Sequence, residues 1–172
     1  MIRYLFAFLL IFFAAFSRLL PHPPNVAPIT AIALFSAVYL DKKYAFIIPV
    51  AAMIISDYFI GFHENVIFVY GSFIIISIIG IWLRKHRSIP TTLGVSVTGS
   101  VIFFMVTNFG VWVMPGSMYQ TNINGLLNCY VAAIPFFRNT LIGDLFYVAA
   151  IFGLYELVKK IFPSILLKES KV

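Results

Sequence analysis

Apolar residues are grouped along the chain into six long runs that short polar segments separate. The runs cover residues 3–20, 26–40, 44–61, 66–83, 92–114 and 136–161. Most have close to the ~20 residues that an α-helix needs to cross ~30 Å of hydrocarbon. The second run is shorter, so we expect it to tilt or to extend into its flanks. None alternates apolar and polar positions as the strands of a membrane β-barrel do. The pattern therefore predicts an all-α integral membrane protein with six transmembrane helices in one domain, residues 1–172.

Two segments need separate interpretation. The first seventeen residues resemble a signal peptide, but the apolar run continues through Leu20 and more runs follow, so an uncleaved first helix is expected. Joining residues 126–134 to the last run would place Pro135 inside one very long helix. Because proline removes a backbone donor and kinks a helix, we predict a short separate helix over 126–134 at the outer face. The last span then begins near Phe136.

Composition supports a membrane protein. Hydrophobic residues make up 62% of the chain and charged residues 10%, whereas soluble domains have about 45–50% and about 25%. The net charge of +6 comes from basic residues at the ends of apolar runs. We interpret them as topology signals next to a lipid bilayer, with no nucleic-acid partner. The single cysteine, Cys129, excludes a disulfide within the chain.

The basic residues predict the orientation. Ten of the twelve fall at the start of the first run (Arg3), in the segments 41–43 and 84–87, or in the tail from Lys159. The alternating connections 21–25, 61–65 and 114–128 contain neither lysine nor arginine. The positive-inside rule therefore places both termini in the cytoplasm, which agrees with an even number of spans.

Strong polar residues converge on the predicted outer half. A charge in hydrocarbon costs at least ~2.5–3.5 kcal/mol, so such residues face a partner or a wet cavity. Helical spacing places Phe104, Asn108 and Trp112 on one stripe and Thr140, Asp144 and Tyr147 on another. Aromatic rings beside amides and carboxylates suit a ring-bearing organic molecule. The candidate ligand-binding residues are Arg18, Asn25, Thr30, Asp57, His63, Tyr70, Asn108, Trp112, Arg138, Asn139, Asp144 and Tyr147.

Other interpretations of these residues remain open. The charged residues can simply pair to fix helix packing. A metal site is weakly supported, because its candidates, His22, His63 and Cys129, stand in three separate connections. Neither a nucleophile motif nor a phosphate-binding glycine loop is present, so no cofactor is expected.

Small residues on the second run allow another helix to approach closely. Ala27 and Ala31, and likewise Ala33 and Ala37, have the small-xxx-small spacing. This spacing fits packing within the bundle or docking of a partner subunit.

Four stretches in order carry a resemblance to known proteins. They are "RLLPHPPNVAPITAIALFSAVYL", "ISDYFIGFHENVIFVYGSF", "TNFGVWV" and "CYVAAIPFFRNTLIGDLFY", within residues 18–153. Together they resemble a family of small bacterial membrane proteins of uncharacterised function. That family in turn resembles the substrate-binding S components of energy-coupling factor (ECF) vitamin transporters. The second likeness is one of layout, with a proline-bearing first outer loop, Ser56–Asp57 and Gly143–Asp144.

The resemblance implies uptake of a small organic nutrient, a vitamin or its precursor, across the bacterial plasma membrane. Docking on a coupling subunit driven by ATPases would then use Ala27, Ala31, Ala33 and Ala37. S components for nickel and cobalt begin with a Met-His pair, whereas this chain begins Met1–Ile2–Arg3. Cobalamin is a candidate substrate, with Cys129 or His63 as a cobalt ligand. The alternatives are an intramembrane enzyme acting on a lipid or isoprenoid, and a structural or assembly subunit.

Overall fold

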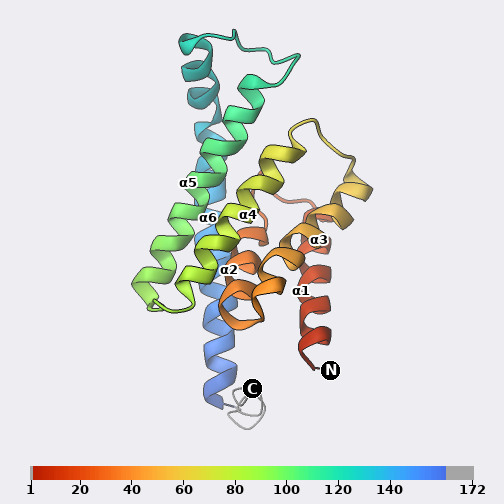
Figure 1. Cartoon of the computed structure of the whole chain (residues 1–172), viewed down its shortest axis with the longest axis vertical. Coiled ribbons are helices and arrows are strands. Elements are labelled where there is room, and N and C mark those ends of the chain that lie inside the picture. The colour runs from red at the N-terminus through yellow and green to blue at the C-terminus, as the bar shows by residue number, and fades with distance from the viewer. Residues whose placement is uncertain (1, 162–172) are drawn as a thin grey trace.

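The computed structural model describes residues 2–161, which form a bundle of helices (Figure 1). The helices are α1 (Ile2–Leu19), α2 (Ile29–Tyr39), α3 (Lys42–Ile60), α4 (Val66–Leu83), α5 (Ile89–Val113) and α6 (Ile123–Ile161). The described residues contain no strand, and the predicted all-α class is confirmed. Four of the helices, α3 to α6, are long and apolar enough to cross a membrane, whereas α2 and the described apolar part of α1 are shorter.

The outer surface is apolar on several helices. Phe8 on α1 is 63% exposed, Ile67 on α4 is 78% exposed and Phe146 on α6 is 64% exposed. Water would penalise so many exposed large apolar side chains, but lipid does not. The exposed surface and the four long helices indicate a membrane protein.

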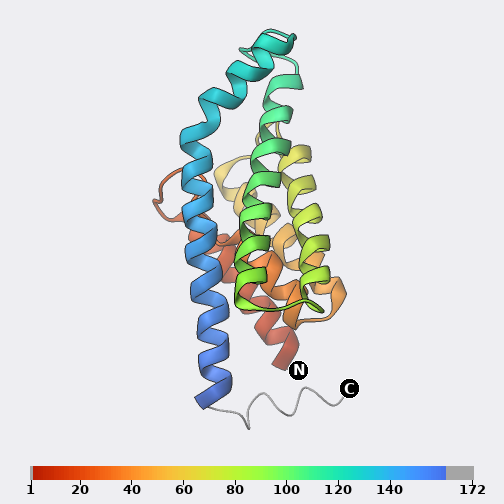
Figure 2. The same ribbon diagram turned by 90° about the vertical axis from the view of Figure 1, so that its left-hand side faces the viewer.

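Helix α6 corrects one prediction. Residues 126–134 and 136–161 belong to one helix, with Pro135 inside it. The missing N–H of Pro135 removes one hydrogen bond, and the turns on both sides continue, so the proline bends the helix without ending it. Figure 2 shows this bend in the first half of α6. The helix starts after Asn122, whose side-chain oxygen accepts a hydrogen bond from the Gly125 N–H at 2.8 Å, as in an N-cap.

Helix α2 lies at the centre of the bundle. It packs against α3, α4, α5 and α6, and every residue from Ile29 to Val38 is buried. A helix that is apolar on all sides is stable only when other helices surround it. Ala31, Ala33 and Ala37 are fully buried, so these alanines are not a surface for a partner subunit. The structure corrects that prediction in favour of packing within the chain, and Ala27 is partly buried against the same core.

Close packing of α2 against α4 depends on Gly80. A Cβ atom at Gly80 would lie 2.7 Å from the Cβ of Ala37. We therefore expect Gly80→Ala to lower the free energy of unfolding by about 1–3 kcal/mol through overpacking. Gly94 on α5 is the control, because nothing lies within 4 Å of its added Cβ. Gly94→Ala should leave stability unchanged or raise it by up to ~1 kcal/mol. Thermal unfolding in detergent measures both, and equal effects would contradict this packing.

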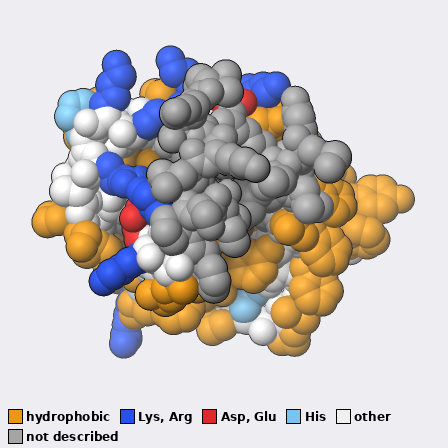
Figure 3. Space-filling view, turned by 90° about the horizontal axis from the view of Figure 1, so that it is seen from below, with side chains coloured by type: hydrophobic (Ala, Val, Ile, Leu, Met, Phe, Trp, Pro, Cys, Tyr) orange, Lys and Arg blue, Asp and Glu red, His pale blue; other side chains and the backbone are white. Residues whose placement is uncertain are grey.

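The two ends of the bundle differ in charge. The connections 20–28, 61–65 and 114–122 are directed to the upper end in Figure 1, and 40–41 and 84–88 to the lower end. Figure 3 views the lower end and shows its Lys and Arg side chains. The connection 84–88, the start of α3 and the end of α6 carry Lys42, Lys43, Arg84, Lys85, Arg87, Lys159 and Lys160. Arg84 also donates from Nε to the Ala37 carbonyl at 2.9 Å, which caps the C-terminus of α2.

Candidate functional site

A buried ion pair connects three helices near the upper end. Arg18, in the last turn of α1, places Nη1 2.7 Å from Oδ1 of Asp57 on α3. The Tyr70 hydroxyl on α4 donates to the other carboxylate oxygen of Asp57 at 2.7 Å. Arg18 also donates to the Ser56 hydroxyl. The Asp57 side chain is 1% exposed and Arg18 16%, so the pair is almost entirely removed from solvent. The charge of Arg18 is therefore balanced within the protein.

A second buried carboxylate lies on α6. Asp144 is 3% exposed, and its Oδ2 accepts a hydrogen bond from the Ser100 hydroxyl on α5 at 2.7 Å. Thr30 at the start of α2 donates a further hydrogen bond. None of the ion pairs among the described side chains involves Asp144. Unlike Asp57, this carboxylate is held by hydroxyl groups alone.

Glycine next to Asp144 permits a close approach of the first connection. A Cβ atom at Gly143 would lie 3.2 Å from Cγ1 and 3.3 Å from Cα of Val26. The same connection is attached to α6 by the Asn139 side chain, which donates to the Pro24 carbonyl at 3.2 Å. The proline-rich segment therefore lies directly against the helix that carries Asp144.

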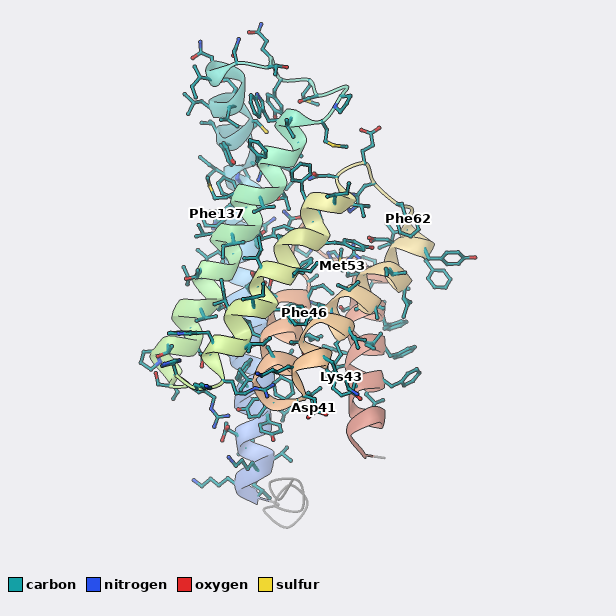
Figure 4. All side chains as sticks on the ribbon, in the orientation of Figure 1. Asp41, Lys43, Phe46, Met53, Phe62 and Phe137 are labelled. Carbon is teal, nitrogen blue, oxygen red and sulfur yellow. The ribbon has the colours of Figure 1, made fainter. Side chains whose placement is uncertain are left out.

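Arg18 and Asp144 border one cavity of about 270 Å³. Its mouth has the exposed side chains His22, Asn25 and His63 from two connections at the upper end. Apolar side chains form much of the remaining wall, including Met53 of α3, which Figure 4 labels. The other lining residues are Ala27, Ile29, Thr30, Val69, Phe73, Phe103 and Thr140.

A second cavity of about 270 Å³ adjoins the first. The two share five lining residues, which are Asn25, His63, Val69, Phe103 and Thr140. The second is more aromatic, with Phe104, Phe136 and Phe137, the last labelled in Figure 4. Asn65 and Asn108 supply amide groups to it. Together the cavities form a site with aromatic walls, amides and one carboxylate that pairs with no cation within residues 2–161.

The structure brings half of the twelve predicted residues to these cavities. Those that line them are Arg18, Asn25, Thr30, His63, Asn108 and Asp144. Asp57 and Tyr70 lie behind Arg18 and hold it in place.

The remaining four predicted residues have other surroundings. The indole N–H of Trp112 donates to the Gln120 carbonyl at 3.0 Å, within the connection between α5 and α6. Tyr147 packs against the buried core, and Asn139 contacts the first connection as described above. Arg138 is exposed on α6. None of the four lines either cavity.

Sequence reasoning missed Ser100 as the partner of Asp144. The sequence does contain a sign of this contact. Ser96 and Ser100 lie one helical turn apart, and both are small polar residues within an apolar run. Comparing the depth of these two serines in the membrane with the depth of Asp144 on the neighbouring span indicates the contact between Ser100 and Asp144. The aromatic wall residues Phe73 and Phe103 have no such signal, because many phenylalanines of this chain lie on its exposed surface instead.

The weak metal candidates do not come together. His22 and His63 both border the first cavity. Cys129 is buried elsewhere, with its sulfur 3.4 Å from the Asn108 carbonyl oxygen. Within residues 2–161, no group of three or more His, Cys, Asp or Glu side chains is arranged to hold a metal ion.

Comparison with known proteins assigns the chain to a family. It belongs to the family of unknown function DUF6580, whose family model matches residues 1–165. This confirms the prediction of a family of uncharacterised function, whereas the resemblance to S components stays a prediction. Neither the curated proteins nor the solved structures contain a match to the chain.

Proposed function

We propose that this protein binds a small organic molecule in the paired cavities and moves it inward across the bacterial plasma membrane. In this proposal all six helices cross the membrane, with both termini in the cytoplasm. Support comes from the distribution of charge, because the lower end carries the basic connections and the cavity mouth lies at the other end. The positive-inside rule then directs the cavity outward. The resemblance to S components supports inward transport.

Cavity size limits the ligand. Each cavity measures about 270 Å³, so the pair falls within the range of about 300–1,000 Å³ typical of pockets for small molecules. A corrin ring with its side groups is larger than this space, so we propose a smaller, single-ring vitamin or precursor as the ligand and not cobalamin. The aromatic side chains Phe103, Phe104 and Phe137 favour a flat ring.

Charge limits the ligand further, and Asp144 is the observation that carries the proposal. The positive charge of Arg18 is balanced by Asp57, whereas Asp144 borders the same cavity and forms no ion pair with any side chain that the structure describes. A buried carboxylate favours a ligand group that donates charge-assisted hydrogen bonds. We therefore propose a ligand with a ring that bears an amine or amidine group.

A screen of thermal stability tests this proposal. The purified full chain in detergent is heated with single-ring amines and amidines and with matched compounds that lack the amino group. We expect saturable stabilisation by one class of amine, since a ligand at 100 times its Kd adds about 2.7 kcal/mol. Arg138→Ala is the control, because Arg138 lies outside the cavities, and it should keep the effect. Equal stabilisation by the compounds without the amino group would contradict the proposed role of Asp144.

A further inference from the structure

Helix α5 carries a row of hydroxyl groups on one face. Ser88, Thr92, Ser96 and Ser100 recur at four-residue intervals, so they lie one above another. Thr92 is 7% exposed, and Ser96 and Ser100 are fully buried. At its upper end the row reaches the first cavity, because Ser100 donates to Asp144.

The lower end of the row reaches a third cavity. This cavity measures about 500 Å³ and lies between α2, α5 and α6 near the basic end. Ser88 and Thr92 line it together with Glu156, whose carboxylate accepts a hydrogen bond from the Tyr39 hydroxyl at 2.7 Å. Arg87 forms an ion pair with the same carboxylate at 3.3 Å. The hydroxyl row therefore runs from the buried carboxylate of Asp144 to a cavity that is bordered by the carboxylate of Glu156, which is 46% exposed.

Ser96, between the two cavities, has an unusual environment. It is fully buried, and its hydroxyl makes no hydrogen bond to any described residue. Burying a hydroxyl without a partner costs about 1–3 kcal/mol, so a packing role alone would favour alanine here. One helical turn separates Ser96 from Thr92 and from Ser100, a rise of ~6 Å. Two hydrogen bonds of ~2.8 Å each through one water molecule span this distance.

The packing around Ser96 decides what can pass. Ser96 lines neither cavity, and on the α6 side the buried side chains of Val148 and Phe152 form part of the wall of the third cavity, so the two cavities are separate. An organic molecule does not fit without separation of the helices, whereas a proton moves by exchange along hydrogen bonds. We infer that the hydroxyl row of α5 carries protons between Asp144 in the first cavity and Glu156 in the third. This inference does not depend on the proposed ligand.

Each proton transfer balances without any other reactant. The Asp144 carboxylic acid releases a proton to the Ser100 hydroxyl, and each following hydroxyl or water accepts one proton and releases another. The last proton reaches Glu156 or the water beside it, and one positive charge has moved. The groups around Asp144 are Ser100 from α5 and Thr30 from α2. Arg18, His22 and His63 face the same cavity from α1 and the two connections.

Proton flux into liposomes tests the inference. The purified full chain is reconstituted into phosphatidylcholine vesicles that contain a pH-sensitive dye, and a potassium gradient with valinomycin drives proton entry. No ligand is added, so the result is separate from that of the binding screen. We expect the wild-type chain to change the internal pH faster than protein-free vesicles do. Ser96→Val and Asp144→Asn should reduce the rate to that of protein-free vesicles.

The matched control is Thr98→Val on the opposite side of α5. Thr98 is exposed, and its hydroxyl donates to the Gly94 carbonyl of its own helix at 2.9 Å, so this variant should keep the wild-type rate. Ser96→Ala gives a second test in case the larger valine disturbs the packing around position 96. This variant should also slow proton entry. Retention of a trapped fluorescent dye excludes general leakage. Equal rates for the wild-type and both Ser96 variants, or for the wild-type and protein-free vesicles, would overturn the inference.

Discussion

Asp57→Ala is expected to lower the free energy of unfolding by about 3 kcal/mol. Removing one member of a buried ion pair leaves the other charge without compensation, which costs ~3–5 kcal/mol. We place the effect at the lower end of that range because Arg18 is 16% exposed and borders a cavity. The same change removes one of two side-chain contacts between Arg18 and α3 and leaves the hydrogen bond to Ser56. Thermal unfolding of the purified chain in detergent measures the loss.

Tyr70→Phe provides the matched control for that result. It removes only the hydrogen bond from the tyrosine hydroxyl to Asp57 and leaves the ion pair with Arg18 in place. Deleting one hydrogen bond to a charged group costs about 1.5–3 kcal/mol. We therefore expect a smaller loss of stability than in Asp57→Ala, which leaves the charge of Arg18 without its partner. Should Tyr70→Phe prove as destabilising as Asp57→Ala, the ion pair would not be the element that holds α1 to the bundle.

Asp144→Asn is expected to fold normally and to lose most of its affinity for an amine ligand. The asparagine oxygen still accepts the hydrogen bond from Ser100, but the negative charge is gone. A hydrogen bond to a charged group is worth about 2–3 kcal/mol here, which corresponds to a roughly 30- to 150-fold increase in Kd. Titration of the stabilising amine from the screen measures Kd. An unchanged Kd in a folded Asp144→Asn protein would mean that the ligand does not contact this carboxylate.

The helices could be predicted because a helix that crosses a membrane requires a long run of apolar residues, which is easy to recognise in a sequence. Each apolar run became a helix or part of one, and the boundaries differ by a few residues except at the start of α6, which begins at Ile123 instead of near Phe136. The fifth run, for example, was predicted from residue 92, but the helix begins at Ile89. The Ser88 side chain accepts a hydrogen bond from the Thr91 N–H at 3.1 Å, and a proline follows in the first turn. Both are helix-start signals that hydrophobicity alone does not register.

Pro135 and the alanines of α2 show the limits of local patterns. A proline reports that one hydrogen bond is missing, but whether the helix ends or bends depends on the residues on both sides. Small-xxx-small spacing reports that a helix can be approached closely, but not which helix approaches. In α2 the residues around Ala31 and Ala37 are apolar on every side except for the small polar residues Thr30 and Ser36, which favours a central position. That uniformity was the available evidence for packing within the chain.

The sequence indicated how deep in the membrane the residues of the candidate site lie, but only partly which of them face the cavities. Arg18 pairs with Asp57 and shares a cavity with Asp144, which agrees with the expectation that charged groups in a membrane segment converge on partners or cavities. Trp112 shares a helical stripe with Asn108, but it lies past the cavity and bonds to the connection that follows α5. Helical spacing identifies a face, whereas the length over which that face borders a cavity depends on how neighbouring helices tilt.

Native mass spectrometry of the detergent-purified protein tests the central claim most directly. The claim is that the paired cavities hold a small organic molecule through Asp144. The wild-type chain and Arg138→Ala, each incubated with the stabilising amine, should carry one added mass equal to that compound. Asp144→Asn, with the same thermal stability, should not carry it under the same conditions. The same added mass on Asp144→Asn, or none on the wild-type chain, would contradict the proposed binding site.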